Sequence, residues 1–281
     1  MKILEKKIIA PNIHQMTLDA PNIARRALPG QFAIAIPNQH SERTPITLCD
    51  WDAEKGEVTV VFLEVGAATR RLAELSQGDE IYSFTGPLGK PFAIEKVGKV
   101  GLAGGCFGIG AILPAAMAFK KAGNEVIVYL EARSSFLLYW HDKLEEAADE
   151  VRYSTSDGSL GSKGHAHDLL DKNLRDGEKF DRILAVGCTF MVFRISQATR
   201  PFKVRTIVSM SPIMIDGTGM CGACRLSVAG KTMFACVDGP HFDGHEVDWD
   251  VVLTRRKAYD EEEIIANERN RWQRSLQLRH H

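Results

Sequence analysis

Three of the chain's six cysteines lie close together late in the sequence, and their spacing could hold a metal cluster. Cys221, Cys224 and Cys236 form the pattern C-x2-C-x11-C, and Asp216 lies five residues before the first of them. With the aspartate as an oxygen ligand, D-x4-C-x2-C-x11-C has the spacing of a plant-type [2Fe–2S] loop. Three glycines in the same stretch would let the backbone wrap around a cluster and direct N–H groups at its sulfurs. They are Gly217, Gly219 and Gly222.

Three other kinds of site remain compatible with these residues. Zinc could be bound by the C-x2-C pair and two further residues, because an H-x3-H pair follows at a finger-like distance. Those further residues would come from Cys236, His241 and His245. The C-x2-C pair could instead be a redox dithiol, or the cysteines could be thiols without a ligand. The spacing favours the iron–sulfur cluster over these three.

A glycine-rich segment follows a predicted strand and opens a predicted helix. Residues 104–110 read GGCFGIG, with Gly105, Gly108 and Gly110 as candidate contacts for a phosphate. Small residues let a phosphate approach the backbone, and a helix N-terminus offers N–H groups with partial positive charge. The spacing departs from G-x-G-x-x-G, so a tight strand-to-helix turn without a ligand explains it about as well.

The segment RTPIT at residues 43–47 begins another predicted strand. Arg43 could pair with a pyrophosphate. The strand beyond it, with Pro45, Ile46 and Thr47, could present backbone groups and a hydroxyl to a flat ring. From these residues alone, a surface arginine beside a strand-edge proline is the simpler interpretation.

The pattern of apolar residues divides the chain into four segments. Residues 1–97 hold short alternating runs broken by proline and glycine, which predicts an antiparallel barrel or sandwich. One helix is predicted inside this segment, from Ala67 to Leu75. Residues 98–210 alternate strands and helices, as in the parallel βαβ units of an open α/β sheet. Residues 211–250 form the cysteine loop, and residues 251–281 form a charged tail with a predicted surface helix.

The composition of the 281-residue chain excludes several classes of protein. Apolar residues make up 44% and charged residues 25%, which is typical of a globular protein. A net charge of −1 gives no overall field to attract nucleic acid or an anionic membrane. The N-terminus lacks the apolar core of a signal peptide, so we expect a reducing, cytoplasmic setting. His280 and His281 are native or belong to a tag, and we set them aside.

One uncharged stretch, residues 100–119, imitates a membrane span in its composition. Its many glycines would weaken a long helix. A short buried strand, a glycine turn and a helix explain the same residues, so membrane insertion is not expected.

Several of these motifs resemble those of the ferredoxin-NADP reductase superfamily, and the likeness spans residues 1–250. R-T-P-I-T is similar to that family's R-x-P-x-[ST] flavin motif. The residues that take the place of its second flavin segment are Gly66, Ala67, Ala68 and Thr69. Residues 86–89, GPLG, are similar to the turn that joins the family's two domains.

The second half of the chain continues this resemblance. Residues 104–110 with Pro114 resemble the family's nicotinamide-dinucleotide phosphate turn. TSDGSLG at residues 155–161, which contains Asp157 and Gly158, resembles its T-x-D-G-S-x-G segment. Most relatives place a Gly-Pro pair after the strand ILAVG, whereas this chain has Cys188-Thr189. The resemblance implies that Cys188 lies beside the nicotinamide.

Within the superfamily, the cysteine pattern and the stretch CVDGPHFDGHEVDW are most similar to electron-transfer subunits. Such subunits serve dihydroorotate dehydrogenase, sulfide dehydrogenase and NADH-dependent ferredoxin:NADP oxidoreductase. The resemblance implies a β-barrel FAD domain, an α/β Rossmann-like NAD-binding domain and a C-terminal iron–sulfur loop. The cluster ligands would be Asp216, Cys221, Cys224 and Cys236. Subunits of dihydroorotate dehydrogenase carry a fourth cysteine where this chain has Asp216, so the ferredoxin:NADP oxidoreductase type is the better match.

The resemblance also implies a function. We expect reversible hydride transfer between NAD(H) and FAD, without a side-chain acid or base, and one-electron transfer through a [2Fe–2S] cluster. The electrons would pass to or from a larger flavin and iron–sulfur subunit, which could reach ferredoxin. Two alternatives stay open: an electron-transfer subunit of dihydroorotate dehydrogenase, and a zinc-bound interaction module without activity. NAD is favoured over NADP by the resemblance, while Glu131 would disfavour and Arg133 would favour a 2′-phosphate.

Overall fold

The first sheet of the computed structural model is antiparallel and has the strand order β1-β2-β5-β4-β3-β6. Its side chains alternate in burial, so that Met16 and Leu18 on one strand and Val58 and Val60 on another face a common core. Met16 pairs with Val60 across the sheet, which fixes the register of this core. The strands are β1 (Ile3–Ala10), β2 (Ile13–Asp19), β3 (Phe32–Ile36), β4 (Thr44–Asp52), β5 (Glu57–Leu63) and β6 (Ser83–Leu88).

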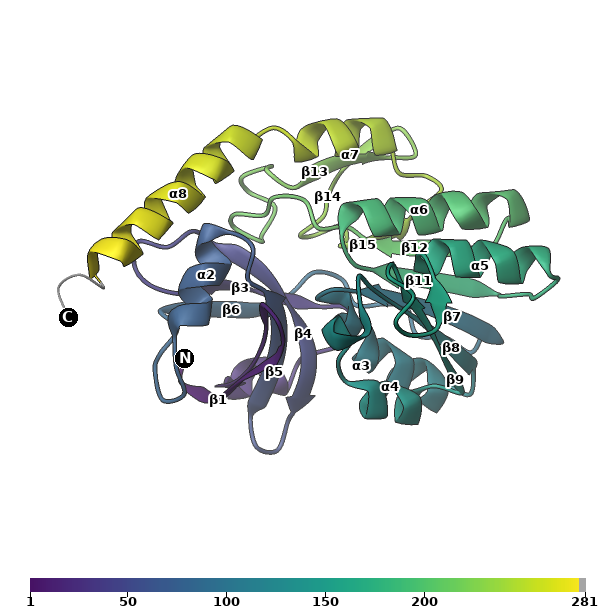
Figure 1. Ribbon diagram of the computed structural model, residues 1–281, viewed down its shortest axis with the longest axis horizontal. Coiled ribbons are helices and arrows are strands. Elements are labelled where there is room, and N and C mark those ends of the chain that lie inside the picture. Colours follow the sequence, from purple (N-terminus) through teal and green to yellow (C-terminus); the bar gives the residue numbers. More distant parts are fainter. Residues whose placement is uncertain (278–281) are drawn as a thin grey trace.

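Two helices accompany this sheet. The short α1 (Pro21–Ala24) follows β2, and α2 (Ala67–Glu74) follows β5 over the residues that the sequence predicts to be helical. Figure 1 shows α2 lying beside β3 and β6. The structure describes the backbone of residues 1–277 and the side chains of residues 1–268, so His280 and His281 lie outside the described part.

The second sheet has the strand order β10-β9-β8-β7-β11-β12-β15 and is parallel except for its last strand. Alternate residues of each central strand are buried on opposite faces: Val100 and Leu102 face one core, and Ala103 faces the other. The strands are β7 (Lys99–Gly105), β8 (Glu125–Ala132), β9 (Glu150–Thr155), β10 (Ser162–Lys163), β11 (Arg182–Val186), β12 (Thr206–Ser209) and β15 (His241–Asp243).

Helices cover both faces of this sheet. On one face, α3 (Gly108–Lys121) and α4 (His141–Ala147) pack against the first of these cores. On the other, α5 (Ala166–Arg175) and α6 (Thr189–Thr199) pack against the second core. Figure 1 shows the two helix pairs on opposite sides of the strands. The fold class predicted from the sequence, a β-barrel followed by an α/β domain, is confirmed.

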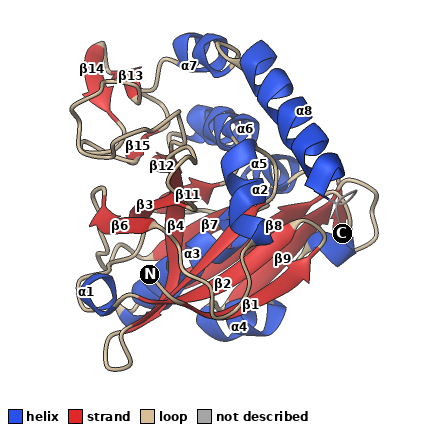
Figure 2. Cartoon of the chain, turned by 90° about the vertical axis from the view of Figure 1, so that its left-hand side faces the viewer, coloured by secondary structure: helices blue, strands red, loops and turns tan. Residues whose placement is uncertain are grey.

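The segment between β12 and α7 is dominated by loops, as Figure 2 shows. It contains one hairpin, β13 (Arg225–Val228) and β14 (Lys231–Phe234), before the chain returns to the second sheet as β15. β15 pairs antiparallel with β12, so the predicted 211–250 segment is joined to the α/β domain by a strand. The helices α7 (Trp249–Arg256) and α8 (Asp260–Gln277) follow, and α8 reaches across to contact α2 (Figure 1).

Side-chain contacts join the barrel to the α/β domain. Trp140 at the start of α4 donates a hydrogen bond to Gln15 of β2 at 3.0 Å, and Lys143 of α4 pairs with Asp50 of β4 at 3.2 Å. The stretch 100–119 that imitates a membrane span folds as β7, a turn and α3. Among the described residues, no helix combines the length and the apolar character needed to cross a membrane.

Candidate functional site

The strand order of the second sheet creates a topological switch point between β7 and β11. From β7 the chain continues through α3 to β8 on one side, whereas β11 continues through α6 to β12 on the other. The two helices therefore leave the carboxyl ends of neighbouring strands toward opposite faces of the sheet. In open α/β sheets, ligands bind in the crevice that this arrangement forms. The glycine turn and Cys188 both lie at this position.

The glycines of the turn allow two stretches of backbone to approach each other closely. A Cβ atom added at Gly108 would lie 2.0 Å from the carbonyl oxygen of Val186 on β11. A Cβ atom at Gly105 would lie 2.7 Å from the sulfur of Met191 on α6. These two glycines therefore let α3 and α6 pack closely against the strand ends.

Two cysteines lie at the mouth of this crevice, and both are exposed. Cys106 has a positive φ of 53°, and its carbonyl oxygen accepts a hydrogen bond from the Tyr139 hydroxyl at 2.8 Å. Cys188 is the N-cap residue of α6. Partial desolvation raises the pKa of the Cys106 thiol, and the nearby Cys188 and Glu131 raise it further. No motif in the sequence marks Tyr139, whose hydroxyl oxygen also accepts a hydrogen bond from the Gly110 N–H at 3.0 Å.

The segment 155–161 forms a tight hydrogen-bonded turn after β9. Asp157 accepts hydrogen bonds from the backbone N–H of Ser159 at 2.9 Å and from its hydroxyl at 2.6 Å. These bonds lower the pKa of Asp157 to about 2, so its carboxylate is ionised at neutral pH. Gly158 has a φ of 78°, which favours glycine at this corner of the turn.

Glu131 has a structural role that the sequence analysis did not foresee. Its carboxylate accepts a hydrogen bond from the Ala166 N–H at 2.9 Å and lies 3.0 Å from Nδ1 of His165. Both partners stand at the N-terminus of α5, where a carboxylate is stabilised by free N–H groups. Both oxygens of the group expected to select against a 2′-phosphate are therefore already engaged by α5.

The predicted flavin residues lie on β4 and at the N-terminus of α2. Arg43 is exposed just before β4, and Thr47 pairs with Phe32 of β3. At α2, the Thr69 hydroxyl oxygen accepts hydrogen bonds from the N–H groups of Val65 and Gly66, both at 3.1 Å. This cap leaves the first helical N–H groups, on Ala67 and Ala68, free to face a ligand.

Two features of the first two turns of α2 would suit an anionic group. A Cβ atom added at Gly66 would meet no atom within 4 Å. The Nη1 atom of Arg70 is buried and has no hydrogen-bond partner in the described part of the chain. A buried guanidinium nitrogen without a partner is costly unless an acceptor approaches it. The pyrophosphate of a flavin dinucleotide fits both observations.

In the cysteine loop, the Asp216 carboxylate lies against the loop's own backbone. Its oxygens accept N–H hydrogen bonds from Thr218 and Met220, both at 3.0 Å, and from Cys221 at 2.8 Å. These bonds lower its pKa to about 2. Asp216 therefore holds the loop in a turn in this structure, and its role as a metal ligand stays a prediction.

The cysteines of the loop differ in exposure. Cys224 and Cys236 are each 2% exposed and their sulfurs lie 3.3 Å apart, whereas Cys221 is exposed. Two thiolates on one tetrahedral ion with metal–sulfur bonds of ~2.3 Å would be about 3.8 Å apart, so binding a shared ion would require these two sulfurs to move apart by about half an ångström. Burial beside Cys224 raises the pKa of Cys236 to about 12, and an adjacent cation would be needed to stabilise its thiolate. Among the described residues, no three His, Cys, Asp or Glu side chains converge on one point.

The two histidines considered for zinc are engaged elsewhere. Nε2 of His241 lies 2.9 Å from the Gly30 carbonyl oxygen, and its ring stacks on Phe92 with centroids 3.7 Å apart. Burial lowers the pKa of His241 to about 4, so the ring is neutral. Nε2 of His245 lies 3.0 Å from the Thr199 hydroxyl. His241 belongs to β15 and ties the cysteine segment to the barrel.

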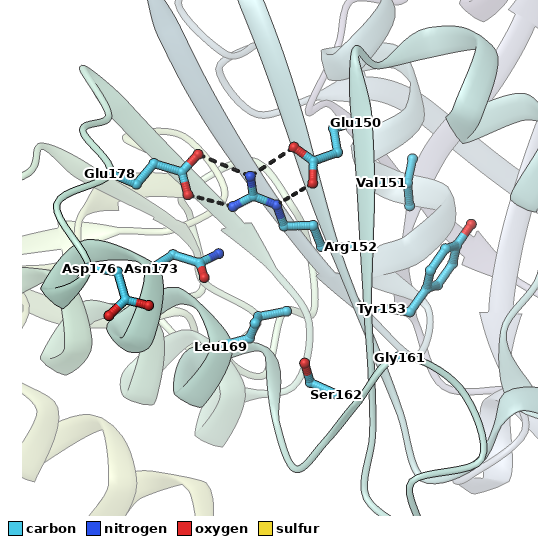
Figure 3. A pocket seen from close by; sticks show the side chains of 10 residues that line it. All are labelled: Glu150, Val151, Arg152, Tyr153, Gly161, Ser162, Leu169, Asn173, Asp176 and Glu178. Atoms are coloured by element: carbon cyan, nitrogen blue, oxygen red, sulfur yellow. Dashed lines mark hydrogen bonds and ion pairs between the residues drawn. The ribbon is translucent and has the colours of Figure 1, made fainter.

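A cavity of about 550 Å³ lies away from these groups, at the amino end of β9. Figure 3 shows Arg152 in this cavity, held between the carboxylates of Glu150 and Glu178. Its Nη1 atom also donates to the Tyr129 hydroxyl at 2.7 Å. The guanidinium is therefore saturated by protein acceptors, and the cavity offers no free cation for a ligand among its lining residues.

Comparison with known proteins agrees with this arrangement. The family model of the iron–sulfur cluster binding domain of dihydroorotate dehydrogenase B matches residues 211–248. The chain is 43% identical to a dihydroorotate dehydrogenase B (NAD(+)) electron transfer subunit homolog of Thermotoga maritima, covering 95% of this chain and 94% of that protein. It is 32% identical to the electron transfer subunit of Desulforamulus reducens, covering 89% and 97%.

Solved structures give the same result. One described as an NADH-dependent reduced ferredoxin-NADP oxidoreductase, studied for flavin-based electron bifurcation, has a chain that is 41% identical with a TM-score of 0.90. The match covers 95% of this protein and 96% of that chain. An Amycolatopsis cytochrome P450 reductase shares the fold at 22% identity and a TM-score of 0.61. The chain belongs to the family of dihydroorotate dehydrogenase B electron-transfer subunits, iron–sulfur oxidoreductase subunits within the ferredoxin-NADP reductase superfamily.

Proposed function

We propose that this chain binds FAD in the barrel, NAD(H) at the switch point of the α/β domain, and a [2Fe–2S] cluster in the cysteine loop. It exchanges hydride between NAD(H) and FAD in either direction and passes single electrons to a larger flavin and iron–sulfur subunit. The complex is an electron-bifurcating, NADH-dependent ferredoxin:NADP oxidoreductase. The preference for NAD rests on the family resemblance.

One contact carries this proposal. A Cβ atom added at Gly110, in the first turn of α3, would lie 3.2 Å from the Cys49 sulfur and 3.2 Å from Val61. Cys49 follows the predicted flavin residue Thr47 by two positions on β4, and its thiol lies 3.5 Å from the Thr47 carbonyl oxygen. The predicted dinucleotide turn therefore packs directly on the predicted flavin strand. Hydride transfer needs the two rings in contact, and this packing brings their sites together.

The chain's own residues bind and orient. The free N–H groups of α2 and the Arg70 guanidinium would hold the flavin pyrophosphate, while Thr47 would offer its hydroxyl and backbone to the ring. The backbone around Gly105 and Gly108 would hold the dinucleotide phosphates at the start of α3, and Cys188 would contact the nicotinamide. Nicotinamide supplies two electrons as hydride, an iron–sulfur cluster carries one at a time, and flavin exchanges with both.

Exposed apolar side chains around the cysteine loop support a protein partner at this site. Met220 is 89% exposed and stands directly before Cys221. Ile213, Ile215 and Val237 add further exposed apolar surface on the same segment. Apolar surface of this kind marks contact sites between proteins. We place the larger subunit here, where the distance from the cluster to its redox centre would be short.

The charged helix α8 is a second candidate contact for that subunit. Ile264 and Ile265 are exposed on its surface among acidic side chains. Truncation after Lys257, which removes α8 but keeps α7 and the hydrogen bond from Arg255 to the Ala223 carbonyl oxygen of the cysteine loop, should abolish co-purification with the larger subunit. Co-purification that survives the truncation would remove α8 from the interface.

The experiment that tests the function is an anaerobic titration of the purified chain. We expect yellow-brown protein that releases flavin on denaturation, contains about two irons per chain, and is bleached by NADH at a lower concentration than by NADPH. Cys224→Ser should lower the iron content while retaining the flavin, because it removes a buried cysteine of the loop. A colourless protein that contains zinc would overturn the proposal in favour of an interaction module.

The proposed ligand Asp216 has its own test. Asp216→Cys should retain a cluster and shift its reduction potential, because a carboxylate is a harder, less polarisable ligand than thiolate. Asp216→Asn is the matched control, since its amide oxygen can still accept from Thr218 or Cys221. An unchanged potential in Asp216→Cys would leave Asp216 only its role in the turn.

A dihydroorotate dehydrogenase partner is the second candidate, favoured by the names of the similar subunits. Asp216 weighs against it, because those subunits are expected to carry cysteine at this position. Reconstitution separates the two candidates: NADH-dependent orotate reduction with a dihydroorotate dehydrogenase catalytic subunit would favour the second, and ferredoxin-coupled NADP reduction with the larger flavoprotein would favour the first.

A further inference from the structure

Two exposed cysteines outside the cysteine loop occupy matching positions just beyond the ends of neighbouring strands. Gly104 of β7 pairs with Val186 of β11, and Cys106 and Cys188 each follow two residues later. The intervening residues are also in contact, because a Cβ atom added at Gly187 would lie 3.4 Å from the Gly105 carbonyl oxygen. Parallel strands lie roughly 4.8 Å apart. The two cysteines therefore follow the neighbouring ends of β7 and β11 at the switch point.

We propose that Cys106 and Cys188 are a redox-active dithiol that forms a reversible disulfide across the switch-point crevice. The oxidant is a low-molecular-weight disulfide, RSSR. One cysteine thiolate attacks it, forming a mixed disulfide and releasing RS⁻. The second cysteine then attacks the mixed disulfide, which releases another thiol. In balance, two protein thiols and RSSR give one protein disulfide and two RSH, so two electrons and two protons leave on the small thiol.

The local backbone suits such a bond. A disulfide requires Cα atoms roughly 4.4–6.8 Å apart, which neighbouring strand ends can supply. Cys106 stands in a left-handed turn between β7 and α3, and Cys188 stands before the first residue of α6. Neither is inside a helix or strand, so each side chain can turn toward the other without breaking a backbone ladder. By contrast, Cys49 is 1% exposed and has no access to an oxidant.

The consequence for binding rests on the proposed function. A disulfide would tie the turn that would hold the dinucleotide phosphates to the residue that would contact the nicotinamide. It would occupy the mouth of the crevice between them. The oxidised form should therefore bind NADH more weakly, by about tenfold or more, and reduction with dithiothreitol should restore the affinity. The site would switch off hydride exchange when the surrounding thiols are oxidised.

Peptide mapping tests the bond without reference to activity. The holoprotein is treated anaerobically with oxidised glutathione, alkylated and digested with trypsin. Cys106 and Cys188 fall in separate tryptic peptides, residues 100–120 and 183–194, and each peptide contains one cysteine. We expect these two peptides to be linked, and the link to be lost in Cys106→Ser and in Cys188→Ser. Cys49→Ser is the matched control and should still give the linked peptide.

The outcomes separate this proposal from the function on which it rests. If glutathione remains attached to single cysteines, or if neither cysteine reacts, the disulfide is excluded even where the reduced protein binds NADH normally. If the linked peptide forms and the NADH affinity falls, the disulfide and the placement of NAD(H) at the switch point are both supported. If it forms and the NADH affinity stays unchanged, the disulfide stands and the placement of NAD(H) at the switch point is wrong.

Discussion

The amino and carboxyl ends of the parallel sheet carry different types of residue. At the amino end, Lys99 of β7 pairs with Glu178 at 2.8 Å and with Glu125 of β8 at 2.9 Å. Arg152 of β9 shares Glu178 and adds Glu150 (Figure 3). At the carboxyl end, the strands β7 and β11 run into glycines and cysteines. Charge is paired within the protein at one end, and the other end leaves backbone N–H groups at a crevice.

This difference separates stability from binding within one sheet. A charged group that is already paired with protein partners has nothing left to offer a ligand, although its network helps to hold the strands in place. At the carboxyl end, groups remain available to a ligand, because glycines expose the backbone and helix N-termini attract anions. Substitutions at the carboxyl end should therefore weaken ligand binding, whereas those at the amino end should change stability alone.

The largest effect should come from Gly108→Ala at the carboxyl end. The added methyl group would lie 2.0 Å from the Val186 carbonyl oxygen, and a backbone atom cannot move away cheaply. We expect a loss of about 1–3 kcal/mol in the free energy of unfolding, together with weaker NADH binding. Gly105→Ala is the matched control, since its methyl would meet the flexible Met191 side chain and should cost less. Urea unfolding measures the loss of stability in each variant, and NADH titration measures the loss of affinity. Equal losses for the two variants would contradict the packing account.

A smaller effect is expected from Arg152→Met at the amino end. The side chains of Arg152 and Glu178 are each 19% exposed, so the pair is only partly screened by solvent. Removing the guanidinium should lower the free energy of unfolding by about 1–2 kcal/mol and leave NADH affinity unchanged. Arg175→Met, which removes an exposed pair with Asp171, should cost much less. A drop in NADH affinity for Arg152→Met would break the division between the two ends.

The smallest effect is the pH dependence of the Arg152→Met difference. Hydrogen bonding to Arg152 lowers the pKa of Glu150. Burial opposes the ionisation of Glu178, but its bonds to Arg152 and Lys99 outweigh burial and lower its pKa as well. Lowered pKa values stabilise the fold above the usual value of 4.5, and this contribution disappears as the pH falls through the lowered values. The stability difference between wild type and variant should therefore shrink between about pH 5 and pH 3. A stability difference that grows as the pH falls would contradict the lowered pKa values of the two glutamates.

The fold could be predicted because its signals are local. Alternating burial in β2 and β5, and the change to longer spacing after Gly98, are visible in the sequence without any knowledge of contacts. The cysteine pattern predicted the iron–sulfur domain for the same reason, because the spacing of the ligands can be counted directly in the sequence. The proposed flavin and nicotinamide contacts stay predictions, although the structure brings their strand and turn together.

The remaining features depend on contacts between distant residues. β15 joins β12 across a long loop, and three strand residues contain too little pattern to reveal it. Glu131 was expected to disfavour a 2′-phosphate from its place at the end of a strand, and the sequence did not reveal that the N-terminus of α5 binds its carboxylate. Asp216 matched a ligand position, and sequence spacing alone could not reveal that the loop amides would bind both of its oxygens. In each case a polar group binds the nearest unsatisfied backbone group in space.

The contact between Gly110 and Cys49 leaves little room for larger side chains where the two domains meet. A methyl group at position 110 would lie 3.2 Å from the Cys49 sulfur and 3.2 Å from Val61, so these neighbours would have to shift by a few tenths of an ångström to accept it. At this contact, two small residues therefore allow the α/β domain to approach the barrel closely.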